Sequence, residues 1–147
     1  MSVETLQAAT PADASEIRAL LESVNLPTAD LSDTSWSHFW VARSKRGIVG
    51  VVGLEPAPPF ALLRSLGVAV ELQGTGLGQR LLKTAEQNAA DLGIRQLGLI
   101  TDSAAAYFQR YGFEPVERSH APAALTSTRQ FREICPESAI LMLKSTG

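Results

Sequence analysis

A glycine-rich turn between a predicted strand and a predicted helix constrains the fold of this chain more than any other feature. Residues 61–70 are mostly apolar and predict a strand, in which Gly67 marks a bulge. The turn at residues 73–78 reads Gln-Gly-Thr-Gly-Leu-Gly. Apolar residues then recur at helical spacing from Leu77 to Leu92, and Gly93 ends the predicted helix. A strand that leads through a turn into a helix is typical of an α/β domain.

The same turn is chemically suited to hold an anion. The amides of the first helical turn have no partners within the helix, and the helix dipole favours a negative charge beside them. Glycines let the backbone curl around such a group without a Cβ in the way. A pyrophosphate is therefore the natural occupant of the turn.

The turn admits several interpretations. A Walker phosphate loop requires Gly-Lys-Ser/Thr, and Gly78 is followed by Gln79 and Arg80, so we discard it. A dinucleotide fingerprint would need its third glycine at position 79. Asp102 at the end of the next predicted strand favours that fingerprint, whereas the hairpin-connected strands before the turn argue against it. In a further interpretation, the glycines only allow tight packing at a helix start.

Periodicity and turn residues predict the remaining elements. We expect strands at residues 3–9, 38–43, 48–54, 96–101, 113–116 and 138–144, and helices after Thr10-Pro11, at 104–111 and at 123–135. Their order predicts one α/β domain over residues 1–147, with a mixed sheet and helices on its faces.

Composition and charge exclude several classes of function. The net charge of −2 offers no basic field for nucleic acid or an anionic membrane. The first residues lack the pattern of a signal peptide, and no apolar stretch could span a bilayer, so we expect a soluble, cytoplasmic protein. Cys135 is the only cysteine, which excludes an intramolecular disulfide. His38 and His120 lack companion ligands, so we expect no metal site.

Two motifs in register resemble the Gcn5-related N-acetyltransferase (GNAT) family. Residues 73–78 look like its Q/R-x-x-G-x-G/A signature, directly after a strand of the expected L-x-V kind. Residues 104–113 resemble its second landmark, a short helix ending in Gly-Phe, here Gly112 and Phe113. The spacing of the motifs and the order of elements also match. The resemblance implies a single-domain α/β (α+β) fold: a mixed, mostly antiparallel sheet with a splayed central strand pair and helices on both faces.

A narrower resemblance concerns a subgroup encoded with arsenic-resistance genes. It rests on residues 61–66 and on the tail at 131–144, which contains Cys135, Pro136, Ser138 and Ala139. This subgroup resemblance does not define a substrate.

The family resemblance implies acetyl-CoA as cosubstrate and assigns residues to it. The pantetheine arm would pair with the bulged strand through the backbone of Leu66, Gly67 and Val68. A free N–H there, assigned to Val68, would polarise the thioester carbonyl. Thr101 and Ser103 match positions of polar cofactor contacts. The residues expected around the pyrophosphate are Gln73, Gly74, Thr75, Gly76, Leu77, Gly78 and Gln79.

Glu55 is the candidate general base, because it ends an apolar strand expected beside the cofactor strand. The alternative is a solvated carboxylate at a strand end before Pro56. Arg64 lies near the reacting end of the cofactor strand. It either binds a carboxylate or oxyanion of the acceptor or pairs with Glu55.

This chain departs from the family at the position of the general acid. The family commonly places a tyrosine four residues before the glycine of Gly-Phe, and Phe108 occupies that position here. Tyr107 and Tyr111 flank it with different orientations on the helix. We therefore expect no tyrosine to be essential.

These observations predict an acetyl-CoA-dependent N-acetyltransferase that acts on a small amine or amino-acid-like compound by direct attack on the thioester. The alternative is a catalytically weak acyl-CoA-binding sensor or partner module, and a nicotinamide-dependent enzyme ranks third. Dimers are frequent in the family, so a homodimer is one expected assembly, although the sequence shows no interface.

Overall fold

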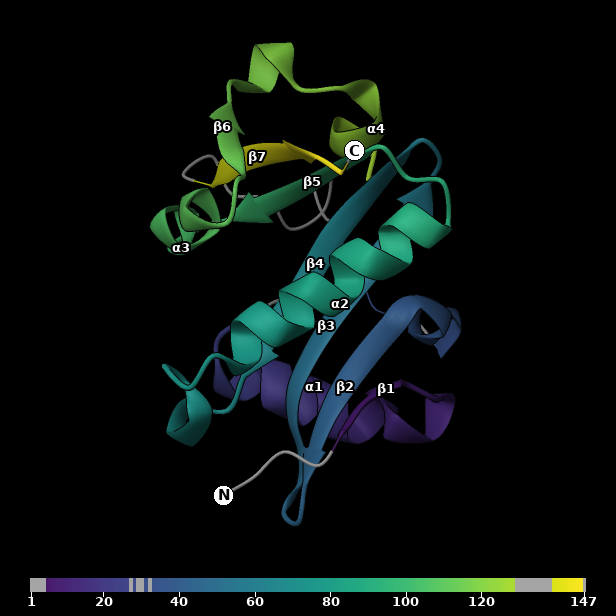
Figure 1. Ribbon diagram of the computed structural model, residues 1–147, viewed down its shortest axis with the longest axis vertical. Coiled ribbons are helices and arrows are strands. Elements are labelled where there is room, and N and C mark those ends of the chain that lie inside the picture. The colour runs from purple at the N-terminus through teal and green to yellow at the C-terminus, as the bar shows by residue number, and fades with distance from the viewer. Residues whose placement is uncertain (1–4, 27, 29–30, 32, 129–138, 147) are drawn as a thin grey trace.

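A seven-stranded sheet in the order β1-β2-β3-β4-β5-β7-β6 forms the centre of the protein (Figure 1). The computed structural model describes residues 5–26, 28, 31, 33–128 and 139–146. The strands are β1 (Thr5–Ala8), β2 (Phe39–Ser44), β3 (Gly47–Ala57), β4 (Phe60–Val68), β5 (Gln96–Thr101), β6 (Glu114–Val116) and β7 (Ile140–Ser145). All neighbours run antiparallel except β4 and β5, which run parallel. The predicted mixed, mostly antiparallel sheet is confirmed.

Helices cover both faces of this sheet (Figure 1). Gly50 of β3 lies against leucines in the first turns of α2 (Leu77–Asp91). Gly67 of β4 pairs with Val51 and so faces the opposite way, where a leucine of α1 (Ala14–Ser23) covers it. The shorter helices are η1 (Pro11–Asp13), η2 (Asp33–His38), η3 (Val70–Leu72), α3 (Ala105–Arg110), η4 (Arg118–His120) and α4 (Ala123–Thr126).

The apolar stripe of α2 packs as its periodicity predicts. Its buried members are Leu77, Leu81, Leu82, Ala85 and Ala89. Leu92, which the sequence placed in the stripe, is 42% exposed because the helix has already ended. Gly93 takes a left-handed φ of 79°, and the N–H of Ile94 donates to the carbonyl of Ala89. These features form a Schellman motif, which only a residue tolerant of positive φ can complete without strain.

The two central strands β4 and β5 pair at one end and separate at the other. Residues 60–62 pair with residues 96–98, and the described ladder contains no β4–β5 pair beyond them. The ring of Phe60 lies over Gly98, 2.8 Å from where a Cβ would stand, so glycine lets the ring close this end. The backbone N–H groups of Arg95 and Gln96 also donate to the carbonyl of Pro59. The predicted splayed pair is confirmed.

A β-bulge lies in β4 close to the position that the sequence indicated. Gly67 pairs with Val51 and Arg64 pairs with Gly53, so two residues of β4 oppose Val52 alone. The irregularity is thus at residues 65–66 and not at Gly67 itself. Position 67 requires a glycine for a different reason, because apolar side chains at the end of α1 pack directly over it.

Several predicted boundaries need correction. β3 continues to Ala57 instead of ending at Leu54, because pairing with β4 extends to the hairpin. β4 ends at Val68, since Val70 begins a 3-10 turn. The helix predicted at 123–135 ends at Thr126 within the described part. Residues 129–135 of that prediction, with Cys135, lie outside the described residues, as do residues 3–4 of the first predicted strand and residue 138 of the last.

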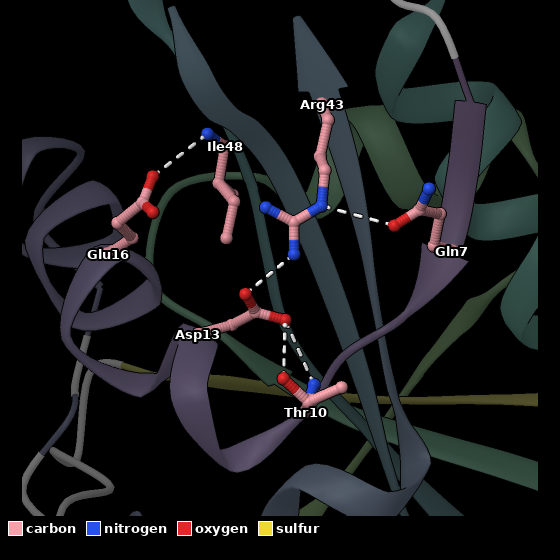
Figure 2. Close-up of polar contacts among 6 residues, drawn as sticks. All are labelled: Gln7, Thr10, Asp13, Glu16, Arg43 and Ile48. Carbon is pink, nitrogen blue, oxygen red and sulfur yellow. Dashed lines mark hydrogen bonds and ion pairs between the residues drawn. The ribbon is translucent and has the colours of Figure 1, made fainter.

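A polar network ties the start of α1 to the first strands (Figure 2). The Asp13 carboxylate accepts hydrogen bonds from Arg43 Nη2 at 2.6 Å and from the backbone N–H of Thr10 at 2.9 Å. Arg43 Nε also donates to Gln7 Oε1 at 3.1 Å. Burial raises the pKa of Asp13, but the hydrogen bonds from Arg43 and Thr10 outweigh it and hold that pKa below its usual value.

The β2–β3 hairpin is anchored to the same helix. Glu16 Oε2 accepts a hydrogen bond from the backbone N–H of Ile48 at 3.2 Å (Figure 2). Gly47, with a φ of 111°, would place a Cβ only 2.7 Å from that oxygen. The hairpin turn that the sequence predicted is therefore held in a fixed place against α1.

We predict that Asp13→Asn lowers the free energy of unfolding by about 1–2 kcal/mol at neutral pH, because a charge-assisted hydrogen bond is lost. The folded-state pKa of Asp13 lies below the unfolded value of about 3.9. The contribution of the carboxylate is therefore present above that value and is lost as the pH falls through the folded pKa. Urea unfolding at about pH 7 and about pH 2.5 should show the difference between wild type and variant closing with acidification.

The Asp91→Asn substitution makes the same chemical change at an exposed residue and is the matched control; it should leave the free energy of unfolding at about pH 7 close to that of wild type. A deficit of Asp13→Asn that is the same size at both pH values would contradict this role for Asp13.

Candidate active site

A cavity of about 1400 Å³ occupies the opening between the separated ends of β4 and β5. Its lining comes from both faces of the sheet: Val24, Asn25 and Leu26 at the end of α1 on one side, and the glycine turn before α2 on the other. The predicted site residues that line it are Arg64, Leu66, Val68, Gln73, Gly74, Gly76, Gly78, Gln79, Thr101 and Ser103. Glu55, Gly67, Thr75 and Leu77 are not among the lining residues.

The backbone of Val68 points toward this cavity. Val68 lies opposite Gly50, while the N–H of the next residue, Ala69, donates to the carbonyl of Val49 at 2.8 Å. Consecutive residues of an antiparallel strand direct their N–H groups to alternate sides, so the N–H and C=O of Val68 face away from β3. The Val68 carbonyl accepts a hydrogen bond from Gln73 Nε2 at 3.1 Å, which links the strand to the turn.

Positive torsions shape the glycine turn. Gly74 has a φ of 82° and Gly76 a φ of 90°, and no atom lies within 4 Å of where a Cβ would stand at either position. The torsion, and not a lack of room, is what requires glycine here. Gly76 is the N-cap of α2 and has no side chain with which to cap it. The first amides of α2 are therefore left for an anion. Thr75 Oγ1 holds the turn by donating to the carbonyl of Leu72 at 2.6 Å.

The third glycine of the turn has a separate purpose. A Cβ on Gly78 would stand 2.7 Å from the hydroxyl oxygen of Tyr107, so glycine makes room for that hydroxyl. The Tyr107 oxygen is buried and has no hydrogen-bond partner among the described residues. Burial, with a smaller effect of Tyr111, raises the pKa of Tyr107, and Arg110 offsets part of the rise.

Phe108 is buried beside the neighbouring tyrosines. It is 8% exposed, lines the cavity, and packs edge-on against Phe113 in the core and against Tyr107, with 5.3 Å between the ring centroids of Phe108 and Tyr107. Tyr107 and Tyr111 also line the cavity, and their rings meet at 5.0 Å between centroids. Tyrosine hydroxyls are thus present beside the site, although Phe108 occupies the position at which the GNAT family commonly has its tyrosine.

Arg64 and Glu55 form an ion pair at the cavity wall. Arg64 Nη1 donates to Glu55 Oε1 at 2.8 Å, with side chains that are 1% and 34% exposed respectively. Arg64 Nε also donates to Ser65 Oγ at 3.0 Å. Of the two roles considered for Arg64, the structure contains the pairing with Glu55. The role of Glu55 as a base stays a prediction.

The segment between β5 and α3 completes the wall opposite β4. Thr101 Oγ1 accepts a hydrogen bond from the backbone N–H of Ala104 at 3.0 Å, which fixes the loop that enters α3. Ser103 and Asp102 are exposed and line the cavity. The predicted polar positions thus lie at the site, and Thr101 also has a structural role.

Val24, Leu26 and Ser65 are among the residues of the site that the sequence did not indicate. Val24 and Leu26 line the cavity only because α1 ends above Gly67, and nothing in their residue types signals that placement. Serine is not a residue expected at a positive φ, so Ser65 gives no sign of the bulge. Tyr107 was expected only as a neighbour of Phe108, and its contact with Gly78 could have been found by asking what each glycine of the turn makes room for.

Among the described residues, no group of three His, Cys, Asp or Glu side chains could hold a metal ion. His120 is exposed and lies near Glu117 in the segment before α4. No helix in the described part of the chain is long and apolar enough to cross a membrane.

The chain matches a family model described as an acetyltransferase (GNAT) domain over residues 35–115. It is 31% identical over 103 residues to N-acetyltransferase family 8 member 3 of Rattus norvegicus, covering 63% of this chain and 45% of that protein. It is 34% identical over 70 residues to an amino-acid acetyltransferase of Pseudomonas aeruginosa, covering 48% of this chain and 16% of that protein. The chain thus spans less than half the length of these relatives.

The fold is similar to that of N-acetylglutamate synthase from Neisseria gonorrhoeae, solved in complex with coenzyme A and N-acetyl-glutamate. The TM-score is 0.83 at 18% identity, covering 97% of this chain and 35% of that chain. A likeness at this identity concerns the fold alone.

We predict that Gly78→Ala destabilises the protein by about 1–3 kcal/mol, because the new methyl group overlaps the Tyr107 hydroxyl. Adding Tyr107→Phe removes that hydroxyl and should restore most of the loss, since the two positions are in direct contact. Thermal unfolding of the two single variants and the double variant measures the coupling.

Tyr111→Phe combined with Gly78→Ala is the matched control and should restore nothing. Additive effects of Gly78→Ala and Tyr107→Phe would show that the hydroxyl is not what the third glycine accommodates.

Proposed function

The chain belongs to the GNAT acetyltransferase family, and on that premise we propose that it transfers an acetyl group from acetyl-CoA to the amine of a small molecule or amino-acid-like acceptor. The observation that carries the proposal is a single cavity with three parts. It begins at the glycine turn, whose first helical amides suit an anion, and follows the edge of β4 that has no strand partner among the described residues. It ends at the buried Arg64 on the face of the sheet covered by α1. The amine nitrogen of the acceptor would attack the thioester carbonyl directly, without a covalent enzyme intermediate. The C–N bond forms as the C–S bond breaks, and coenzyme A leaves as a thiolate that takes a proton from water.

The residues around the turn fit a pyrophosphate and its linker. The left-handed glycines and the start of α2, which no side chain caps, offer backbone N–H groups to the phosphates at Gly74 and at residues 76–79. The N–H groups of Gln73 and Thr75, which the sequence also assigned to the pyrophosphate, instead donate within the turn to the carbonyls of Val70 and Leu72. The open edge of β4 at Leu66 and Val68 offers main-chain partners to the pantetheine amides. Thr101 and Ser103 extend the polar contacts from the opposite wall. Acetyl-CoA, when bound, supplies the activated thioester.

The chain's own groups then act on the reaction in three ways. The N–H of Val68 faces the cavity and can donate to the thioester carbonyl oxygen, which is worth about 3 kcal/mol for one such donor. Glu55 accepts the proton of the amine through a water molecule, since its side chain is exposed enough to reach solvent but does not line the cavity. The cavity walls hold the amine against the thioester, which lowers the entropic part of the activation barrier.

Arg64 supports an acceptor that carries an anionic group. A guanidinium that is almost fully buried favours a carboxylate or a similar oxyanion within reach. Its ion pair with Glu55 places an acid beside that cation, a combination suited to an amino acid with both an amine and a carboxylate. The amino-acid acetyltransferases among the relatives support the same substrate class.

Further parts of the proposal rest on the sequence. The chain covers only part of the length of its relatives, so its partners are proposed from its own sequence. We propose a small-molecule acceptor, no nucleic acid or membrane partner, and a homodimer as one assembly. The arsenic-resistance subgroup stays a prediction, and the relatives named above do not bear on it.

The proposal is tested by measuring thiol release from acetyl-CoA over a panel of amines and amino acids, beside thermal shifts with acetyl-CoA, CoA and NAD. We expect stabilisation by acetyl-CoA and turnover of at least one amino-acid-like amine. Binding of CoA without turnover of any amine would favour the sensor module. Phe108 supports that alternative, because the family usually has a tyrosine at this position. Stabilisation by NAD alone would favour the nicotinamide enzyme.

We predict that Arg64→Ala raises the KM for the acceptor about tenfold or more, because the anionic group of the acceptor loses its partner. The KM for acetyl-CoA should change little, since the glycine turn holds the phosphates. Steady-state kinetics with each substrate varied in turn provide the measurement. An unchanged acceptor KM would remove Arg64 from the binding site.

We predict that Glu55→Gln lowers kcat/KM by about 10²–10⁴-fold and removes the acidic limb of the pH–rate profile, because the amide cannot take a proton. The amide still accepts a hydrogen bond from Arg64, so the fold should persist. An unchanged pH–rate profile in the variant would eliminate Glu55 as the base.

A further inference from the structure

The bulge in β4 is held in a conformation that its residue does not favour. Ser65 has a φ of 59°, in the left-handed region where a side chain costs about 1 kcal/mol or more. A β-bulge that begins with a left-handed residue usually has glycine there. Serine at this position therefore requires surroundings that hold the torsion in place.

Those surroundings are the ion pair already described. Arg64 Nε donates to Ser65 Oγ at 3.0 Å, and Arg64 Nη1 donates to Glu55 Oε1 at 2.8 Å. The Arg64 side chain is 1% exposed, so it is enclosed by protein. Across the ladder, Arg64 pairs with Gly53, and the ring of Phe39 fills the place of a side chain at Gly53. The arginine thus contacts both Glu55 and Ser65, and it donates to the hydroxyl of the bulged residue.

The bulge decides which way the N–H of Val68 points. Val49 directs its carbonyl to β4, where the N–H of Ala69 takes it. Without the extra residue of the bulge, the register beyond Ser65 would shift by one, and Val68 instead of Ala69 would lie opposite Val49. The Val68 N–H would then donate to β3 and would be lost to the cavity.

We infer that Glu55, Arg64 and Ser65 form a clamp that holds the β4 bulge and so keeps the Val68 N–H directed at the reacting carbonyl. The three residues act as positioning residues through the backbone, whatever else Glu55 and Arg64 do. The inference rests on the proposed function for its effect on the rate, but the clamp itself is a property of the protein without substrate.

Substitutions at Ser65 test the clamp without altering the charge of Arg64. Ser65→Ala keeps a Cβ, and with it the cost of the left-handed torsion, but removes the hydroxyl that Arg64 contacts. Ser65→Asn tolerates the same torsion and keeps an acceptor for Arg64. We expect Ser65→Ala to fold and to bind CoA with unchanged affinity, because the glycine turn holds the phosphates. Its kcat should fall about tenfold or more, as for other losses of alignment at a reacting centre. Ser65→Asn should stay within about threefold of wild type in kcat, with its left-handed tolerance and acceptor retained.

Amide hydrogen exchange in the ligand-free protein provides a second readout. The N–H groups of Gly67 and Ala69, which face β3, should exchange faster in Ser65→Ala than in wild type, because the strained bulge has lost the contact that holds it. Ser119→Ala makes the same chemical change at an exposed residue outside the cavity and should leave both kcat and exchange unchanged. Calorimetric titration with CoA and thermal unfolding complete the set.

The outcomes separate the clamp from the proposed function. Wild-type kcat and unchanged exchange in Ser65→Ala would overturn the clamp. If the wild-type protein turns over no amine, the proposed function fails, and exchange then decides the clamp by itself. Faster exchange in Ser65→Ala with rescue in Ser65→Asn supports the clamp, and unchanged exchange overturns it.

Discussion

Two parallel strands that pair over three residues and then separate determine the rest of this structure. Backbone N–H and C=O groups must find partners when they are buried, and a strand that leaves its neighbour exposes a row of them. Here that row lines a cavity instead of joining another strand. Unpaired N–H and C=O groups at a sheet edge usually favour aggregation. Here the separation places such groups inside the domain, where they are available to a ligand.

The remainder of the fold keeps the opening from closing. α2 seals one face with a leucine and alanine stripe, and α1 covers the other face over Gly67. β7 pairs with the whole length of β5, so the far side of the opening cannot swing back toward β4. The network around Asp13 and Arg43 anchors α1 at its start, far from the cavity, and leaves the other end of the helix at the cavity wall.

The sequence predicted the parts of this structure that repeat or that need glycine. The stripe of α2, the left-handed turn before it and the order of strands followed from periodicity and from torsions that only a few residue types accept. The helix ending in Gly112 was expected from its motif, and Thr101 and Ser103 were assigned to the cavity by family resemblance. What could not be predicted depends on contacts between distant segments. The left-handed Ser65 and the approach of Tyr107 to Gly78 each require the register of two elements. The pairing of Arg64 with Glu55 was one of two roles that the sequence left open, and only the structure shows the ion pair. The register shifts by one residue at a bulge, which the sequence placed at Gly67 and the structure places at residues 65–66.

The cavity opens on both faces of the sheet, and only the β4 strand separates the end of α1 from the glycine turn. Under the proposed function, the backbone of this one strand would contact both substrates, one on each side. A change of acceptor preference made within β4 would then also disturb the binding of acetyl-CoA. The short segment at Val24, Asn25 and Leu26 lines the cavity on the side away from the glycine turn, so substitutions there would alter the proposed acceptor pocket and leave the turn unchanged.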